Sequence, residues 1–135
     1  MAVFKDEAEA TKYLAGIFEQ AMDDVPLSDA LAASGVILRI DYSDPKAVIT
    51  IDMPNKKVYS GGCDVAPTVE MFMSADLGNQ YWLGKLNLAV AMAKGQVRAK
   101  GPVPKILKLV PVSKQLFPRY EAMLREDGRE DLLTA

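Results

Sequence analysis

Hydrophobic spacing along the chain predicts helices first and strands afterwards. Apolar residues recur at helical spacing over residues 10–21. Asp6 precedes them as a candidate cap, and Glu9 follows it three residues later, which is a typical helix start. A second, shorter helix is expected from Leu27 to Ala33 and should end at Gly35.

From residue 36 the hydrophobic period changes from helical to alternating. Apolar and polar residues alternate over residues 36–42 and again over 47–52, and the turn between them contains Pro45. This pattern predicts a β-hairpin. Further strands are expected at residues 57–60 and 67–74.

The stretch from Ser74 to Lys100 concentrates apolar bulk and predicts two short helices joined at Gly84. Asn87 is a candidate cap for the second helix, and Gly95 occupies a position where glycine commonly ends a helix. Residues 96–100 then alternate polar with apolar, as a half-buried strand does.

The C-terminal part predicts an interrupted helix. Pro104 suits a first helical turn, and the apolar residues among the lysines of 105–110 continue it. Pro111 removes a helical hydrogen bond and should kink or split the helix, and Pro118 should interrupt it again. The charged tail, residues 125–135, is expected to be frayed.

This order of elements predicts the α+β class. Helices come first, followed by four strands, two short helices, a fifth strand and a last helix. Consecutive strands favour a mainly antiparallel sheet that helices cover on one face. A chain of 135 residues is expected to form one domain over residues 1–135, large enough to fold without disulfides or metal.

Composition excludes several kinds of chemistry. The chain contains no histidine, which removes the commonest general base, the serine triad and most zinc sites. Its single cysteine, Cys63, has no histidine to activate it. No acidic loop has calcium-ligand spacing. We therefore expect no metal, no cofactor and no catalytic residue.

Targeting signals are also missing from the sequence. The N-terminus has no uninterrupted apolar region of the kind that signal peptides carry. No stretch approaches the roughly 20 apolar residues of a membrane span. A single cysteine forms no internal disulfide, so a reducing cytoplasm is the expected location.

Charge is distributed unevenly, although the net charge is only −2. Between Asp76 and Glu121 there is no acidic residue, but there are eight basic ones. The bland interpretation is a solvated face. Two functional alternatives are contact with an anionic membrane surface, at about 1 kcal/mol per basic residue, or contact with an anionic ligand headgroup. No nucleic-acid-binding motif accompanies these charges. The basic residues are Lys85, Lys94, Arg98, Lys100, Lys105, Lys108, Lys114 and Arg119.

Residues 67–101 resemble the sterol carrier protein type 2 family of non-specific lipid-transfer domains. The segment GKLNLAVAMAKGQVRAKG, residues 84–101, carries the resemblance. It combines a Gly-Lys-Leu step, a short helix with a small and apolar face, a glycine, an alternating basic strand and a final glycine. The resemblance implies a five-stranded mixed sheet with helices on one side and an apolar tunnel between them.

The resemblance also implies a function, namely intracellular binding and transfer of a hydrophobic ligand without covalent chemistry. The ligand would be a fatty acyl chain, an acyl-CoA or a sterol-like lipid. Basic residues such as Lys85 and Arg98 would contact its headgroup or a membrane. The tunnel wall carried over by position comprises Met71, Met73, Trp82, Leu83, Leu86, Val90, Met92, Ile106, Leu109 and Val110.

Several alternatives stay open at this point. Met71 and Met73 suit an adaptable ligand surface, but they equally suit gaps in an ordinary core. In the family the C-terminal helix closes one end of the tunnel, and Pro111 and Pro118 in this closing helix depart from the family's pattern. The domain could instead be an interaction module that binds a partner through Leu107, Leu116 and Phe117. It could also present substrate as an accessory subunit of a lipid- or steroid-metabolising enzyme.

Overall fold

A five-stranded mixed sheet organises the chain, and the computed structural model describes residues 2–135 of it. The strand order is β3-β2-β1-β4-β5. β1 pairs parallel with β4, and the other three pairs are antiparallel. The prediction of a mixed, mostly antiparallel sheet is therefore confirmed. The strands are β1 Ile37–Ser43, β2 Ala47–Asp52, β3 Lys57–Ser60, β4 Val69–Ser74 and β5 Arg98–Lys100.

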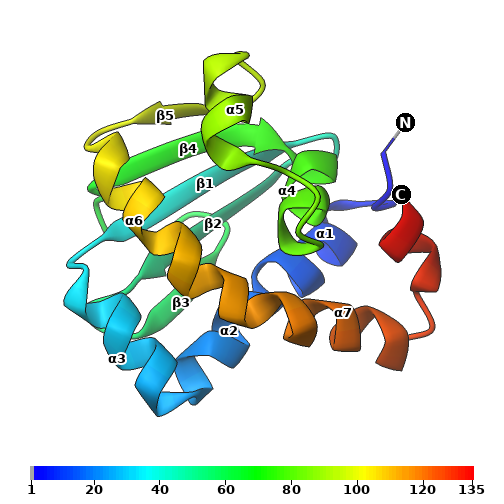
Figure 1. Ribbon diagram of the computed structural model, residues 1–135, viewed down its shortest axis with the longest axis horizontal. Helices are drawn as coiled ribbons and strands as arrows, with labels where there is room; N and C mark the ends of the chain where they lie inside the picture. The colour runs from blue at the N-terminus through cyan, green and yellow to red at the C-terminus, as the bar shows by residue number, and fades with distance from the viewer. Residues whose placement is uncertain (1) are drawn as a thin grey trace.

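Helices pack on one face of this sheet, which confirms the predicted α+β class. Figure 1 shows α6 lying diagonally across the sheet and α7 continuing it beyond the strands. The α-helices are α1 Glu7–Leu14, α2 Gly16–Asp23, α3 Val25–Ala33, α4 Ala75–Trp82, α5 Leu88–Ala93, α6 Val103–Ser113 and α7 Phe117–Glu126. Two 3₁₀ helices, η1 Lys114–Leu116 and η2 Glu130–Thr134, complete the chain.

Strand alternation decides which face of the sheet the helices cover. In β1 every second side chain is buried, and Ile40 stands opposite Ile49 of β2 and Met71 of β4. This register places the apolar residues of three strands on the same face. The opposite face carries Arg39, whose guanidinium lies 2.9 Å from a carboxylate oxygen of Glu70.

The first predicted helix is present as two consecutive helices. Asp6 caps α1 as expected, because its carboxylate accepts a hydrogen bond of 2.9 Å from the backbone N–H of Glu9. The predicted apolar positions are buried on both α1 and α2. Gly35 follows α3 with a positive φ of 69°, a conformation that favours glycine.

The closing helix divides at a different point from the one predicted. Helix α6 runs through Pro111, and the division falls at η1, directly after Ser113. Pro118 does not interrupt a helix but lies in the first turn of α7, where its missing N–H would have no helical partner. Pro118 therefore fits the start of its helix, whereas Pro111 lies in a helix interior.

The C-terminal tail differs from the expectation of a frayed end. Leu132 in η2 is 1% exposed, and its carbonyl accepts a 3.0 Å hydrogen bond from the side-chain amide of Asn79. Arg129 forms an ion pair of 2.7 Å with Glu9 of α1. The two leucines at 132 and 133 were the apolar signal within this charged segment.

The buried amide of Asn79 joins α4, α7 and η2. Its oxygen accepts a 2.6 Å hydrogen bond from the Tyr120 hydroxyl, while its nitrogen donates to the Leu132 carbonyl. We expect Asn79→Ala to lower the free energy of unfolding by about 2–3 kcal/mol, because two buried polar groups lose their partner. Urea unfolding measures this change. Gln80→Ala is the control, and an equal loss in both variants would contradict the assigned role of Asn79.

Candidate ligand-binding site

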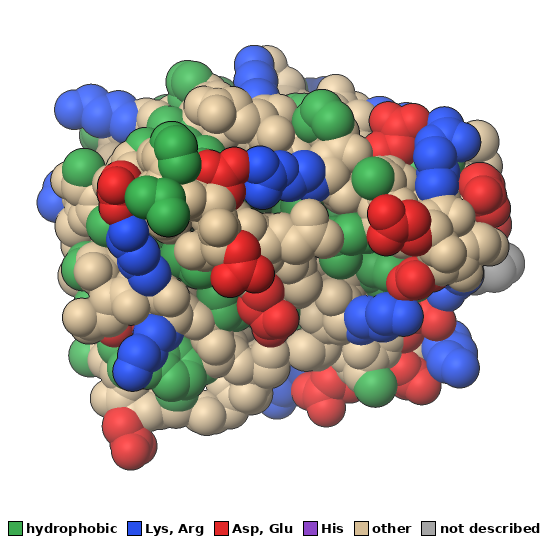
Figure 2. All heavy atoms as spheres, turned by 90° about the horizontal axis from the view of Figure 1, so that it is seen from below, with side chains coloured by type: hydrophobic (Ala, Val, Ile, Leu, Met, Phe, Trp, Pro, Cys, Tyr) green, Lys and Arg blue, Asp and Glu red, His purple; other side chains and the backbone are tan. Residues whose placement is uncertain are grey.

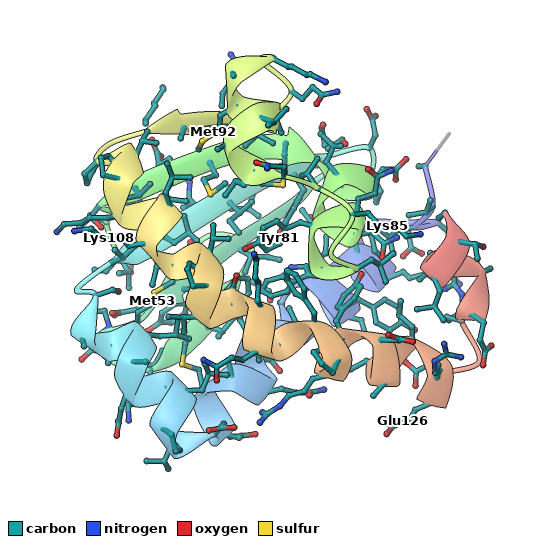
Figure 3. The ribbon with its side chains drawn as sticks, viewed as in Figure 1. Met53, Tyr81, Lys85, Met92, Lys108 and Glu126 are labelled. Atoms are coloured by element: carbon teal, nitrogen blue, oxygen red, sulfur yellow. The ribbon has the colours of Figure 1, made fainter. Side chains whose placement is uncertain are left out.

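A cavity of about 70 Å³ lies between the sheet and helix α6. Apolar side chains form almost all of its wall. Figure 3 shows two of them, with Tyr81 in the space between α4 and α6 and Met53 toward α3. The sheet side consists of Leu38, Ile40, Tyr42, Met53, Met71 and Met73. The helix side consists of Phe18, Leu31, Gly78, Tyr81, Trp82, Leu88, Ile106, Leu109, Val110 and Ser113.

Helix α6 covers the cavity with an apolar stripe. Ile106, Leu109 and Val110 are spaced three and four residues apart and therefore share one face of the helix. Leu107 and Lys108 are exposed, and Figure 3 shows Lys108 pointing away from the protein. One face of the helix therefore lines the cavity, and the opposite face is exposed.

The volume of the cavity decides what it holds without rearrangement. About 10–15 Å³ on this measure is enough for one water molecule, whereas pockets for drug-sized ligands occupy about 300–1,000 Å³. The cavity of about 70 Å³ is therefore smaller than such pockets. A long acyl chain would enter only if the helices move outward from the sheet.

An aromatic cluster supports one side of the cavity. The Trp82 ring lies 5.2 Å from the Phe18 ring and 5.2 Å from the Tyr81 ring, both in edge-to-face orientation. Phe117 of α7 approaches Trp82 at 6.1 Å, also nearly perpendicular. Such pairs contribute about 0.5–1.5 kcal/mol each beyond their buried area. They therefore stabilise the packing on this side of the cavity.

The polar groups on the cavity wall are hydroxyls. Ser113 Oγ donates a 2.8 Å hydrogen bond to the Val110 carbonyl, and the Tyr81 hydroxyl donates to Ser113 Oγ. Burial raises the pKa of Tyr42 and that of Tyr81 above the ordinary tyrosine value, so both hydroxyls stay protonated well beyond neutral pH. Among residues 2–135, no charged side chain lines the cavity.

A groove on the protein surface adjoins the cavity. Tyr81, Leu88 and Val110 line both spaces and therefore form the partition between them. Lys85 and Lys114 lie along the groove, which runs between α6 and the segment that connects α4 with α5. The cationic groups are thus outside the apolar cavity but next to it.

Six of the ten residues expected in the tunnel wall line the cavity, namely Met71, Met73, Trp82, Ile106, Leu109 and Val110. The other four lie elsewhere. Leu86 lines the surface groove, Val90 is 46% exposed, and Leu83 and Met92 are half-buried against the core. The helical spacing of residues 86–93 suggested an inward face. The helix begins only at Leu88, and Leu88 and Ala91 are its buried residues.

The two basic residues expected at the headgroup lie in different parts of the structure. The Lys85 ammonium donates a 2.6 Å hydrogen bond to the Leu133 carbonyl and borders the groove. Arg98 belongs to β5, where its guanidinium lies 5.6 Å from the centre of the Phe72 ring. Among the described residues, Arg98 is therefore not part of either the cavity wall or its groove.

Sequence reasoning missed the wall residues that come from segments distant in the chain. Phe18, Leu31 and Met53 close the end of the cavity near α3. Their signal was only the apolar face of a helix or strand, which is the same signal that an ordinary core residue gives. Tyr42 belongs to the alternating segment 36–42, but nothing in its spacing indicated a cavity.

Other kinds of site find no support in the part of the chain that the structure describes. Residues 2–135 contain no group of three or more acidic, cysteine or histidine side chains able to hold a metal ion. No helix among them combines the length and apolar character needed to cross a membrane. Cys63 is half-buried, with its thiol nearest the Val65 carbonyl.

Gly78 on α4 is needed for the position of Tyr42. An added methyl group at Gly78 would lie 2.7 Å from Cε1 of Tyr42. Although alanine usually stabilises a helix relative to glycine by about 1 kcal/mol, we expect Gly78→Ala to lower the free energy of unfolding by about 1–3 kcal/mol. Tyr42→Leu should recover most of this loss, as urea unfolding would show.

The control for this prediction is Gly16→Ala in α2, where the added methyl group meets only the flexible end of Met123. This variant should change stability by less than about 1 kcal/mol. If Gly78→Ala were as stable as the parent protein, or if Tyr42→Leu recovered nothing, the proposed clash would be absent.

Of the protein families, curated proteins and solved structures compared with the chain, only solved structures resemble it. No family model matches the sequence, and no curated protein matches it either. The similar solved structures include three sterol carrier proteins. A sterol carrier protein domain of Helicoverpa armigera is 19% identical, with a TM-score of 0.67 over 87% of this chain and 95% of that one. Sterol carrier protein 2 of Yarrowia lipolytica in its apo form is 16% identical, with a TM-score of 0.63 over 73% and 85%.

The third is sterol carrier protein 2 of Aedes aegypti, solved in complex with palmitate. It is 17% identical, with a TM-score of 0.61 over 77% of this chain and 94% of that one. These structures share the sheet and the covering helices over most of their length, whereas few residues are identical. The likeness therefore concerns architecture, and this chain has the fold of sterol carrier protein 2 domains.

Proposed function

We propose that this protein binds and transfers a hydrophobic ligand, held without covalent chemistry between the sheet and helix α6. The ligand is a fatty acyl chain, an acyl-CoA or a sterol-like lipid. The observation that carries the proposal is the apolar cavity with no charged side chain on its wall among residues 2–135. The palmitate complex of the similar Aedes aegypti protein supports the same ligand class.

Binding would be driven by removal of the ligand's apolar surface from water. Each buried methylene contributes about 0.8 kcal/mol, so a long acyl chain can be retained with few polar contacts. Met53, Met71 and Met73 on the sheet side favour loose selectivity, because unbranched thioether side chains adapt to differently shaped ligands. No reacting group is required for this function.

The ligand would enter through the partition of Tyr81, Leu88 and Val110. Displacement of α6 from the sheet would enlarge the cavity and join it to the surface groove. A carboxylate or phosphate headgroup would then remain in the groove beside Lys85 and Lys114, which keeps its charge hydrated.

The outer surface near α5 and α6 suits contact with an anionic membrane. Val90 is 46% exposed and Leu107 is 37% exposed, which makes them two of the exposed large apolar residues. Lys94, Lys105 and Lys108 are also exposed there, and none forms an ion pair within residues 2–135. By contrast, the face seen in Figure 2 mixes acidic and basic side chains.

Native mass spectrometry of the purified protein, followed by organic extraction, tests the proposed function. We expect a bound lipid, or saturable uptake of palmitate by the protein in solution. A mass that remains ligand-free after incubation with fatty acids and sterols would contradict it. A partner-binding role would then be favoured, although Leu116 is buried and Phe117 half-buried, so only Leu107 of the three suggested contact residues is exposed.

Filling the cavity should prevent uptake. Ile106 on α6 is 4% exposed and lines the cavity, and we expect Ile106→Phe to weaken palmitate binding at least tenfold, because the larger ring occupies space that the ligand needs. Isothermal titration measures the affinity. Val25→Phe on α3, which is 63% exposed and lines neither the cavity nor the groove, should leave it unchanged. Equal affinities in both variants would argue against this cavity as the site.

Charge reversal on α6 should weaken membrane contact. We expect Lys105→Glu combined with Lys108→Glu to reduce binding to phosphatidylserine-containing vesicles by about 2 kcal/mol or more at low salt, because each basic residue near the surface contributes about 1 kcal/mol. Vesicle sedimentation measures this binding. Lys46→Glu combined with Lys57→Glu matches the change in charge at exposed positions in the β1–β2 turn and on β3. If both pairs lost affinity equally, net charge rather than α6 would be responsible.

A further inference from the structure

One tyrosine that lines the cavity has a hydroxyl without a partner in the protein. Tyr42 is 4% exposed and lines the cavity, yet its hydroxyl makes no hydrogen bond within residues 2–135. The other tyrosines that pack among the helices all donate one, since Tyr13 bonds to Asp127, Tyr81 to Ser113 and Tyr120 to Asn79. Tyr42 is thus the exception among these four tyrosines.

An unpaired hydroxyl in an apolar interior is unfavourable, because it gives up its hydrogen bonds to water without replacement. The fold nevertheless accommodates a tyrosine at position 42. Gly78 leaves room for the Tyr42 ring at a helical site where any added Cβ would lie 2.7 Å from it. Among residues 2–135, the fully enclosed side-chain polar atoms without a partner are Arg39 Nε and Thr50 Oγ1. The Tyr42 hydroxyl is not one of them, so it borders open space in which a partner can lie.

The nearby polar groups do not supply the missing partner. Ser113 Oγ donates to the Val110 carbonyl and receives the hydrogen bond from Tyr81, so these two hydroxyls already satisfy one another. No lysine or arginine among residues 2–135 lines the cavity. The Tyr42 hydroxyl is therefore a free donor. The cavity that Tyr42 lines carries no positive charge, whereas the open surface hollow that it also lines contains Lys46 and Arg98.

We propose that the Tyr42 hydroxyl donates a hydrogen bond to an uncharged oxygen of the ligand, an alcohol or a carbonyl, and so makes the cavity selective for neutral amphiphiles. This inference rests on the proposed function. A neutral oxygen supplies the acceptor that Tyr42 lacks. A carboxylate at the same point would lose its hydration without gaining a cation, so a fatty acid keeps its charged end in the outer groove beside Lys85 and Lys114.

The test compares hexadecan-1-ol with palmitate, which have equal chain length, by displacement of a fluorescent fatty probe from the full-length protein. The parent protein should bind the alcohol more tightly. Tyr42→Phe should weaken alcohol binding about threefold to tenfold, as expected for the loss of one hydrogen bond, and change palmitate binding by less than about twofold. Tyr59→Phe on β3, which does not line the cavity, is the matched control and should change neither affinity.

Thermal unfolding without ligand provides a second measurement. Tyr42→Phe should be at least as stable as the parent protein, because it removes a hydroxyl that has no internal partner. Tyr120→Phe should be less stable, because it breaks the 2.6 Å hydrogen bond to Asn79. A marked loss of stability in Tyr42→Phe would mean that its hydroxyl is already bonded and would overturn the inference.

The binding outcomes separate the inference from the proposed function. If the parent protein binds both ligands but Tyr42→Phe leaves alcohol binding unchanged, or weakens both ligands equally, the assigned selectivity is wrong and lipid binding still stands. If the parent protein binds neither ligand saturably, the proposed function fails and the inference fails with it.

Discussion

The structure depends on burial of one apolar face of the sheet. The parallel pairing of β1 with β4, with Ile40 opposite Met71 and Tyr42 opposite Met73, brings the apolar residues of both strands to the same side. That face is too apolar to remain in water, so helices from both ends of the chain must cover it. The site, the aromatic cluster and the packed C-terminal tail all follow from how they do so.

The helices that cover the sheet do not all pack equally closely against the interior. The N-terminal helices and α7 bury several side chains completely, and the Asn79 amide bonds α7 and η2 to α4. Helix α6 contacts the interior mainly through Ile106 and Leu109, which are buried but border empty space. The cavity therefore lies under the part of the cover that holds the sheet least closely.

Sequence patterns predicted those features that depend on residues close together in the chain. Period, caps and turns were enough to predict the strands, the Asp6 and Asn87 caps and the sheet class, because these features depend on neighbours along the chain. The cavity depends on the distances between elements, so Phe18 and Met53 gave only an ordinary core signal. The tail at Leu132 was missed because its partner, Asn79, lies 53 residues away. Because most residues of the tail are polar or charged, its two leucines, which pack against the core, gave only a weak apolar signal.

The short 3₁₀ segment η1 between α6 and α7 has a kinetic consequence. It separates a helix anchored through Tyr120 and Leu124, both fully buried, from a helix with only a narrow apolar stripe. Outward rotation of α6 about this joint would disturb neither the Asn79 hydrogen bonds nor the aromatic cluster around Trp82. Exchange of the proposed ligand would then require only local opening and no global unfolding.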